Sequence, residues 1–382
     1  MFLNHQIEVL RTSVGMVFNQ TYELDLPKTG KLSSLVMYLR STQNGQPFLT
    51  AVRWRLIDYI TKVEVIGDGA QVIKSLSGAQ LAAAGYYDET VEPPNMWRHY
   101  SNSPHRQWFV INFGRWLADE LFGLDLARYN QVTLKVTNDA TATEFTTDID
   151  IDVIAVWNRE PSALYRGYLR EEEWKFWAPA AAETEYNDLP TGMPIRRIML
   201  QGLPAVDTAD AKNNSSMHRL MSDIELTSRT GQVRWYKGSL EQLGHLSVMF
   251  LKHQPMSMTH IDRTDEYGYE VGVGYVTNGV VSEGSQTATP SATGSVGSGD
   301  VQDSSQEVRN RTADQPLQGL WRGHGYMHCL PLFMARKPDL SDLLDPEIEK
   351  TVKLDILCAS GTTVAGTSRA ARNAIILSRL VR

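Results

Sequence analysis

The sequence predicts an all-β fold in which the same structural unit occurs twice along the chain. Runs of β-branched and alternating apolar residues, such as 63–66 and 131–136, are short and are separated by turn-forming residues, which favours β-sandwiches over βαβ folds. Three sequence anchors also recur in the same order in the two halves of the chain. Together these observations predict two tandem sandwiches of roughly eight strands each.

The first anchor is an Asp-Leu-Pro triplet that precedes an apolar strand. The triplet begins at Asp25 in the first half and at Asp188 in the second. The strands that follow repeat this separation, from Leu35 to Ile198, and we call it the early offset. A single short match has little weight, so the duplication needs further anchors.

The second anchor is a β-hairpin. Residues 66–76 contain two strands joined by a Gly-Asp-Gly turn, and a Gly-containing turn between two such strands is a hairpin signal. In the matching segment, 229–240, Lys237 is separated from Lys74 by the early offset. Two anchors therefore share one separation along the chain.

The third anchor is a late strand, and it also indicates an insertion. Val132 and Val352 lie in similar strands, but their separation, which we call the late offset, is larger than the early offset. The second unit therefore carries extra residues before this strand. The candidate insertion is 277–305, which is dominated by Gly, Ser, Thr, Val and Ala. Such a composition buries too little apolar surface to offset its ordering entropy, so we expect a long exposed loop.

Helical signals are few. The segments 115–122 and 339–344 are expected to form short helices in equivalent loops before the late strands of each unit. A third candidate helix, 75–84, begins after a strand. Helices this short leave the fold class all-β.

Charge and composition exclude several function classes. The chain has 37 Lys and Arg against 44 Asp and Glu, a formal net charge of −7, which disfavours direct binding to nucleic acid. The two cysteines, Cys329 and Cys358, lie in apolar runs and are expected to be buried free thiols in a protein made in a reducing compartment. No run approaches the roughly 18 apolar residues of a membrane span, and the first residues lack the apolar core of a signal peptide. We therefore expect a soluble protein that is not exported by that route.

The order of these segments resembles that of a known family. The run 54–69, the segment 113–136 and the restart at 186–200 are similar to double jelly-roll major capsid proteins of tailless icosahedral DNA viruses, a lineage that includes membrane-containing phages and the adenovirus hexon. The resemblance extends from about residue 21 to the end of the chain. It rests on architecture and segment order, and no chemical motif contributes to it.

The resemblance implies a fold and a division of the chain. The fold is all-β, with two tandem eight-stranded jelly rolls and short helices in late loops. The expected parts are an N-terminal arm at 1–20, a first jelly roll at 21–157, a connector at 158–185 and a second jelly roll at 186–382. The arm is expected either to fold against the base of a shell or to be a frayed terminus.

The same resemblance implies a structural function. In such proteins three copies form a pseudo-hexagonal capsomer, and capsomers tile an icosahedral virion. The expected partners are other copies of the chain, minor capsid and vertex proteins, and an underlying viral membrane. The expected location is the virion shell after synthesis in the host cytoplasm. No enzymatic activity, cofactor or metal is expected.

The connector carries the candidate interaction residues. An acidic stretch at 171–173 predicts the start of a helix, and Trp174, Phe176 and Trp177 follow it before Pro179. A simple linker would seldom contain three large aromatic residues. We therefore expect these side chains to pack between the two sandwiches or against a neighbouring subunit.

Two groups of residues invite a metal-site interpretation. Asp148, Asp150 and Asp152 alternate along one strand, but a strand offers a row of carboxylates rather than an enclosing loop, so we expect a solvated outer face. His324 and His328, beside Cys329, would lie roughly 13 Å apart in an extended strand, too far for one zinc ion.

Other chemistry finds no support in the sequence. His253 and His260 have no matching carboxylate pattern. The nearest Gly-x-Ser-x-Gly-like text, 294–299, lies in low-complexity sequence, where such matches are expected from composition. Neither a P-loop nor a dinucleotide fingerprint follows a predicted strand.

Two alternative functions remain at this point. The nine tryptophans could supply stacking platforms in a glycan-active or glycan-binding double jelly-roll protein, which predicts exposed Trp and acidic residues in one cleft. The chain could instead be a minor vertex or spike protein of a virion. Copy number in purified particles separates that alternative from a lattice protein.

Overall fold

The computed structural model describes residues 4–44, 55–96, 104–159, 164–205, 217–261, 269–270, 273–283, 307–308, 317–334, 343–359 and 370–382. The chain divides into two compact units. Unit 1 contains most of the chain up to Glu173 together with Leu377–Arg382, and the described residues of unit 2 lie within Trp174–Ile376.

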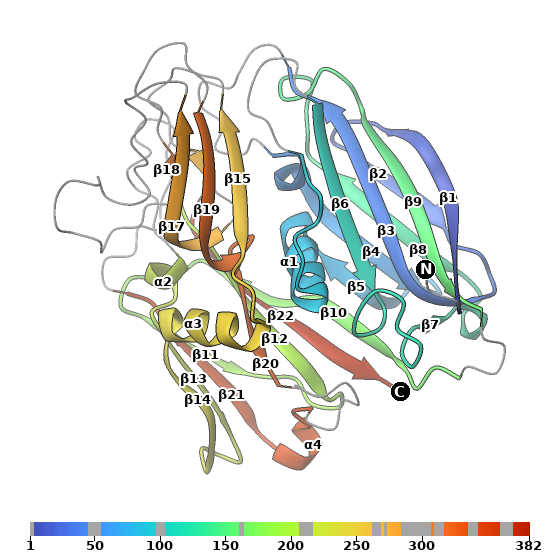
Figure 1. The fold of residues 1–382 in the computed structure, drawn as a ribbon. Helices are drawn as coiled ribbons and strands as arrows, with labels where there is room; N and C mark the ends of the chain where they lie inside the picture. Colours follow the sequence, from blue (N-terminus) through green and yellow to red (C-terminus); the bar gives the residue numbers. More distant parts are fainter. Residues whose placement is uncertain are drawn as a thin grey trace. The chain divides into compact units, whose positions relative to one another are not determined.

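Unit 1 consists of two antiparallel sheets (Figure 1). One sheet has the strand order β1-β9-β3-β6, and the other begins β2-β8-β4-β5. The strands are β1 (His5–Met16), β2 (Thr21–Asp25), β3 (Lys31–Thr42), β4 (Ile60–Gly67), β5 (Gln71–Leu76), β6 (Pro104–Asn112), β7 (Leu124–Asp125), β8 (Val132–Asn138) and β9 (Ile149–Asn158). The helices are η1 (Leu56–Tyr59), α1 (Gly78–Glu89) and η2 (Leu126–Arg128). The short β7 pairs with β3.

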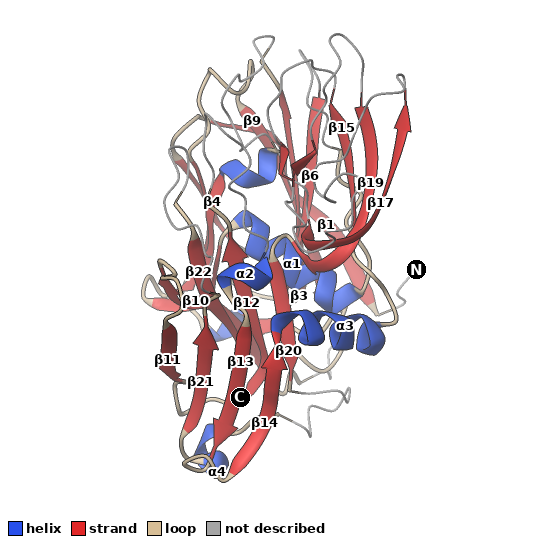
Figure 2. Cartoon of the chain, turned by 90° about the vertical axis from the view of Figure 1, so that its left-hand side faces the viewer, coloured by secondary structure: helices blue, strands red, loops and turns tan. Residues whose placement is uncertain are grey.

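Unit 2 repeats this arrangement. One sheet has the order β11-β21-β13-β14 (Figure 2), and β22-β12-β20 follow β10 in another. The strands are β10 (Tyr168–Trp177), β11 (Thr184–Asp188), β12 (Ile195–Leu203), β13 (Asp223–Ser228), β14 (Val233–Ser239), β20 (Cys329–Phe333), β21 (Val352–Leu357) and β22 (Arg372–Val381). The helices are α2 (Met217–Leu220), α3 (Leu240–Leu251) and α4 (Pro346–Glu349). The first half of β10 and the end of β22 belong to unit 1.

Unit 2 also holds extra strands between α3 and β20. They are β15 (Met256–Ile261), β16 (Tyr269–Glu270), β17 (Val273–Glu283), β18 (Glu307–Val308) and β19 (Leu317–Tyr326). The order β15-β19-β17 forms one sheet and β16-β18 another. The expected loop at 277–305 begins inside β17, and its part beyond Glu283 lies outside the described residues.

The two sets of strands correspond one to one. In the order of strands across each sheet, β1-β9-β3-β6 corresponds to β10-β22-β12-β20, and β2-β8-β4-β5 corresponds to β11-β21-β13-β14. Each set of eight has the connectivity of a jelly roll. The all-β prediction of two tandem eight-stranded jelly rolls is therefore confirmed.

Equivalent hydrogen bonds support the duplication. Leu26 N donates to Val132 O, and Leu189 N donates to Val352 O, both at 2.8 Å. The two donors are separated by the early offset and the two acceptors by the late offset. The late offset also relates Asp125 to Asp345, whose carboxylates each cap a short helix before the late strand.

The hairpin anchor needs a correction of one residue. The helices α1 and α3 both begin with a capping box, formed by Ser77 and Gln80 in one and by Ser239 and Gln242 in the other. The separation of these boxes, which we call the hairpin offset, is one residue shorter than the early offset. Strand pairing agrees with it, because each hairpin contains one bulge at the equivalent place. Lys74 therefore corresponds to Tyr236, and the sequence alignment of Lys74 with Lys237 is wrong.

Most of the predicted N-terminal arm at 1–20 is instead the strand β1, His5–Met16. From His5, which pairs with Asn158, to Met16, which pairs with Ile149, β1 follows β9 along its whole length. Most β1 side chains are exposed, so the strand lacks the apolar alternation by which strands are predicted. The first jelly roll therefore begins at His5.

The predicted connector is likewise part of a jelly roll. Residues 168–177 form strand β10 and not the acidic start of a helix. Glu171 in this strand is buried and its carboxylate lies 2.7 Å from Lys74 Nζ. The acidic run at 171–173 suggested the start of a helix. In the structure the Lys74 ammonium compensates the buried charge of Glu171, so the run can form a strand.

Of the predicted helices, one forms, one does not form and one lies mostly outside the described residues. The helix expected at 75–84 exists as α1, which begins after its N-cap Ser77. No helix forms at 115–122, where Arg115 and Asp119 make an ion pair of 2.7 Å that closes a loop. Residues 339–342 lie outside the described residues, Leu343 and Leu344 are not helical, and α4 follows them.

We predict that losing one member of the Lys74–Glu171 pair destabilises the fold more than losing both. Lys74→Met leaves the carboxylate buried without its cation and should lower the free energy of unfolding by about 3–5 kcal/mol. The double variant Lys74→Met/Glu171→Leu removes both charges and should recover most of that loss. Urea denaturation of the wild type and the two variants measures this, and a double variant as unstable as the single one would contradict it.

Candidate functional site

The three predicted aromatic residues lie close together at the end of β10. Phe176 is 64% exposed, and the guanidinium carbon of Arg372 lies 4.6 Å from its ring centroid. Trp174 and Trp177 are half-buried. Lys175, between them, donates to Asn187 Oδ1 at 2.6 Å. The segment is thus held in a strand and still presents a large apolar ring to solvent.

The structure does not assemble the candidate metal ligands. Met327 and His328 have positive φ values of 51° and 60° and form the turn between β19 and β20, so His324, His328 and Cys329 do not lie in one extended strand as assumed. Within the described ranges, no group of three or more His, Cys, Asp and Glu side chains could hold a metal ion. The side chain of His260 is not among those described.

The aspartate row on β9 forms ordinary surface contacts. Asp152 Oδ1 accepts a hydrogen bond from Arg40 at 3.0 Å and one from Ser13 N at 2.5 Å. Ile149, Ile151 and Val153 between the carboxylates are buried. The strand therefore has one core face and one polar face, as the alternation predicts.

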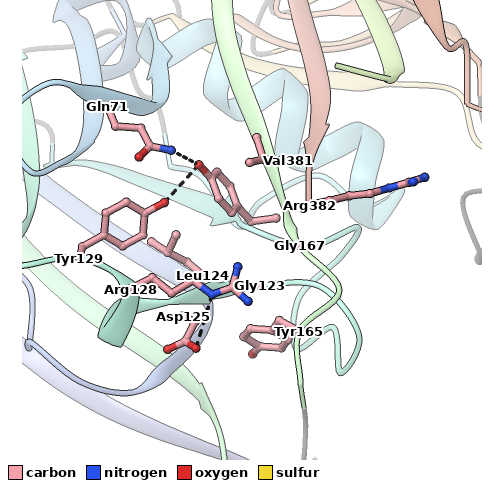
Figure 3. Close-up of a pocket in the computed structure, with 11 residues that line it drawn as sticks. Gln71, Gly123, Leu124, Asp125, Arg128, Tyr129, Tyr165, Gly167, Val381 and Arg382 are labelled. Carbon is pink, nitrogen blue, oxygen red and sulfur yellow. Dashed lines mark hydrogen bonds and ion pairs between the residues drawn. The ribbon is translucent and has the colours of Figure 1, made fainter. Parts of the chain in front are cut away.

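Unit 1 contains a pocket of about 210 Å³ beside the end of the chain (Figure 3). Three tyrosines, Tyr129, Tyr165 and Tyr168, contribute to its lining together with the last two residues. Tyr168 Oη accepts a hydrogen bond from Gln71 Nε2 at 2.7 Å, and Tyr129 Oη donates to it at 3.2 Å. Figure 3 shows the side chains of Gln71 and Tyr129 converging.

The chemistry of this pocket suits binding more than catalysis. Burial raises the pKa of Tyr129, with a further contribution from the hydrogen bond to Tyr168, and burial also raises the pKa of Tyr165. Phenols with raised pKa values stay protonated at neutral pH and donate hydrogen bonds. Arg128 lies beside Asp125, with 3.9 Å between Nε and Oδ2.

A second small pocket in unit 2 surrounds a buried histidine. His324 lies against Tyr275, whose ring is nearly parallel at 5.9 Å, and against His245 at 4.6 Å. Within the described part of the chain, neither ring nitrogen of His324 has a hydrogen-bond partner. Burial, and to a smaller extent the nearby His245, lower the pKa of His324 to about 4. This residue is therefore a neutral core histidine.

Sequence reasoning missed other exposed apolar residues. Helix α3 exposes Leu246, Met249 and Phe250, whereas its counterpart α1 buries most of its side chains. The outer strand β1 exposes Ile7 and Val9. The run Met249-Phe250-Leu251 was a usable signal for α3, because three consecutive apolar residues cannot all lie on the buried face of one helix.

Comparison with solved structures identifies the fold. The STIV MCP crystal structure matches over 98% of this chain and 96% of that one, with a TM-score of 0.60 and 8% identity. The PBCV-1 virus capsid protein matches with a TM-score of 0.53 and 12% identity, over 100% of this chain and 96% of that one. The major capsid protein P2 of bacteriophage PM2 matches with a TM-score of 0.51 and 8% identity, over 99% and 98%.

These matches show the fold class of the chain. The chain is a double jelly-roll protein, with the fold of the major capsid proteins of these viruses over nearly its full length. No protein-family model matches the sequence, and no curated protein sequence is similar to it. Among the described residues, no helix has the length and apolar character required to cross a membrane.

We predict that His324 makes unit 2 sensitive to acid. Its pKa is about 4 in the folded protein and about 6.5 when unfolded, so the unfolded state takes up the proton first as pH falls. Stability from this group is complete above about pH 6.5 and should fall by about 3 kcal/mol towards about pH 4.

The variant His324→Phe should lose this part of the pH dependence. Unfolding free energies between pH 7 and pH 4 measure it, and His245→Gln should keep most of this pH dependence because burial is the larger cause of the lowered pKa of His324. Equal slopes for the wild type and His324→Phe would contradict the prediction.

Proposed function

We propose that the protein is a structural capsid protein whose homotrimer forms a pseudo-hexagonal capsomer of an icosahedral virion. The observation that carries this proposal is the strand-for-strand duplication of a jelly roll in one chain, together with its full-length similarity to viral major capsid proteins. A first jelly roll at 5–158 and a second from 168 onwards replace the boundaries expected from sequence.

Symmetry explains why duplication suits a shell. Three copies of a chain with two similar jelly rolls present six similar lateral surfaces, so capsomers can pack in a nearly hexagonal lattice. The two rolls can still diverge, because each has its own core. The extra strands of unit 2 lie between α3 and β20, where an insertion leaves the eight jelly-roll strands intact.

The alternative glycan-binding function gains no support from the described tryptophans. Trp108 stacks on Tyr38, with ring centroids 4.2 Å apart, and Trp157 is buried. The more exposed Trp116 and Trp235 belong to different units. A minor vertex or spike protein would share the fold, and the abundance of the chain in purified particles distinguishes that role.

The proposal also specifies the binding partners. Other copies of the chain are the first partners, and minor capsid and vertex proteins and an underlying viral membrane are the next. The net charge of −7 supports the absence of direct contact with nucleic acid. The location is the virion shell.

Solution mass and particle shape test the function. The purified protein should behave as a trimer of about 129 kDa, three times 42.9 kDa, in light scattering, and as three-fold particles with a hexagonal outline in electron microscopy. A stable monomer that binds an oligosaccharide would overturn the proposal.

We also predict that the β10 aromatic residues contact a neighbouring subunit. Phe176→Ala, or the triple substitution of Trp174, Phe176 and Trp177 by Ala, should weaken the trimer because a large apolar ring loses its buried contact. Tyr186→Ala, at a 73% exposed aromatic residue of β11, is the matched control. Sedimentation velocity measures the effect, and a triple variant with an unchanged trimer would refute it.

A further inference from the structure

Among the strands that the structure describes, each unit has a sheet whose end strand has no neighbour on one side. In unit 1, β1 is the outer strand of the sheet β1-β9-β3-β6, and in unit 2, β14 is the outer strand of β11-β21-β13-β14 (Figures 1 and 2). Such a strand presents unpaired backbone N–H and C=O groups, which form a template for another strand. Both strands therefore have unused pairing capacity.

The outer strand β1 has little of the usual protection. Its first five residues, His5 to Val9, pair with β9 without a break, and the register shifts begin only after Val9. Ile7 is 66% exposed and Val9 is 57% exposed on this stretch. A long outer strand with exposed apolar side chains normally has a partner.

A pairing within the chain shows how such a partner strand could bind. By the strand correspondence, β10 is equivalent to β1 and β5 is equivalent to β14. Inside unit 1, β10 pairs in parallel with β5, with Glu171 opposite Lys74 and Glu172 opposite Ser75. The ion pair between Lys74 and Glu171, with both side chains buried, closes this junction.

We propose that β1 of one copy pairs in parallel with β14 of the next copy, repeating between copies the pairing of β10 with β5. This inference rests on the proposed trimer. Pairings within and between chains then alternate around the ring, so three copies leave neither strand open. A head-to-tail contact of this kind closes only when the rotation per copy completes a circle.

The offsets between the units give the register. The early offset, which holds for β2 and β11, places Glu8 at the position of Glu171. The hairpin offset places Tyr236 at the position of Lys74 and Lys237 at that of Ser75. Glu8 then lies opposite Tyr236, and Val9 lies opposite Lys237.

The proposed register brings a negative residue of β1 near a positive residue of β14. Arg234 and Lys237 on β14 both contact the single carboxylate of Glu225, at 2.8 and 3.1 Å, which leaves the strand with a surplus positive charge. Glu8 on β1 is exposed and accepts a hydrogen bond from Trp157 Nε1 at 2.8 Å. β1 also carries Arg11, so the complementarity is local: in this register Glu8 lies next to the position opposite Lys237, where opposite charges favour association.

Disulfide cross-linking between copies tests the pairing. Directly opposed residues on neighbouring strands are about 4.8 Å apart, which is within the range that a disulfide spans. The double variant Val9→Cys/Lys237→Cys should give covalent dimers and trimers on a non-reducing gel under mild oxidation, and reductant should remove them. Cys329 and Cys358 are buried, so the wild type should give none.

Matched controls separate this pairing from general proximity. Val17→Cys combined with Lys237→Cys moves one thiol beyond the end of β1, to a residue that is 50% exposed, and should give no covalent trimer. Val9→Lys should raise the concentration at which the trimer half-dissociates at least about tenfold, whereas Val17→Lys should leave it unchanged.

The outcomes distinguish this inference from the proposed function. A trimer in light scattering that forms no cross-link between positions 9 and 237 would overturn the strand pairing and leave the capsid function standing. A protein that stays monomeric would overturn both. Covalent trimers that the Val17→Cys control does not give would support the pairing.

Discussion

The open edge of a β-sheet is the constraint on which this structure depends. Backbone groups on an outer strand must be paired, covered or protected, because otherwise they recruit other strands without specificity. Unit 1 meets this requirement at β5 by accepting β10 in parallel, and it buries Lys74 and Glu171 at the junction. Among the described strands of one copy, β1 and β14 have no neighbour on their outer sides, and the proposed pairing between copies would cover both.

The sequence predicted the repeated features well and the strand boundaries less well. The Asp-Leu-Pro anchor located the following strands β3 and β12 correctly. The residue after each Asp makes the same backbone hydrogen bond in both units, which accounts for the shared local sequence. The outer strand β1 and the inner strand β10 were missed. Their side chains are exposed or paired through charge, as with Glu171, and neither state produces the apolar alternation that identifies a strand.

Specific contacts that the residue pattern does not reveal account for the remaining misses. At 115–122 the Asp119 carboxylate accepts hydrogen bonds from the backbone N–H groups of Arg115 and Leu121 and pairs with the Arg115 guanidinium, so the segment is a closed loop. The aromatic residues of β10 were recognised by composition, but their exposure beside Arg372 was not predictable from sequence. The pocket lined by Tyr129, Tyr165 and Tyr168 joins segments that are far apart in the chain, so its existence depends on the fold.

A three-dimensional reconstruction of the assembled protein by cryo-electron microscopy tests the central claim most directly. The account predicts six jelly rolls around a three-fold axis, with rolls of the first and second kind alternating and β1 of each copy paired with β14 of the next. A reconstruction in which the two rolls do not alternate around a closed ring, or in which single chains remain unassociated, would contradict it.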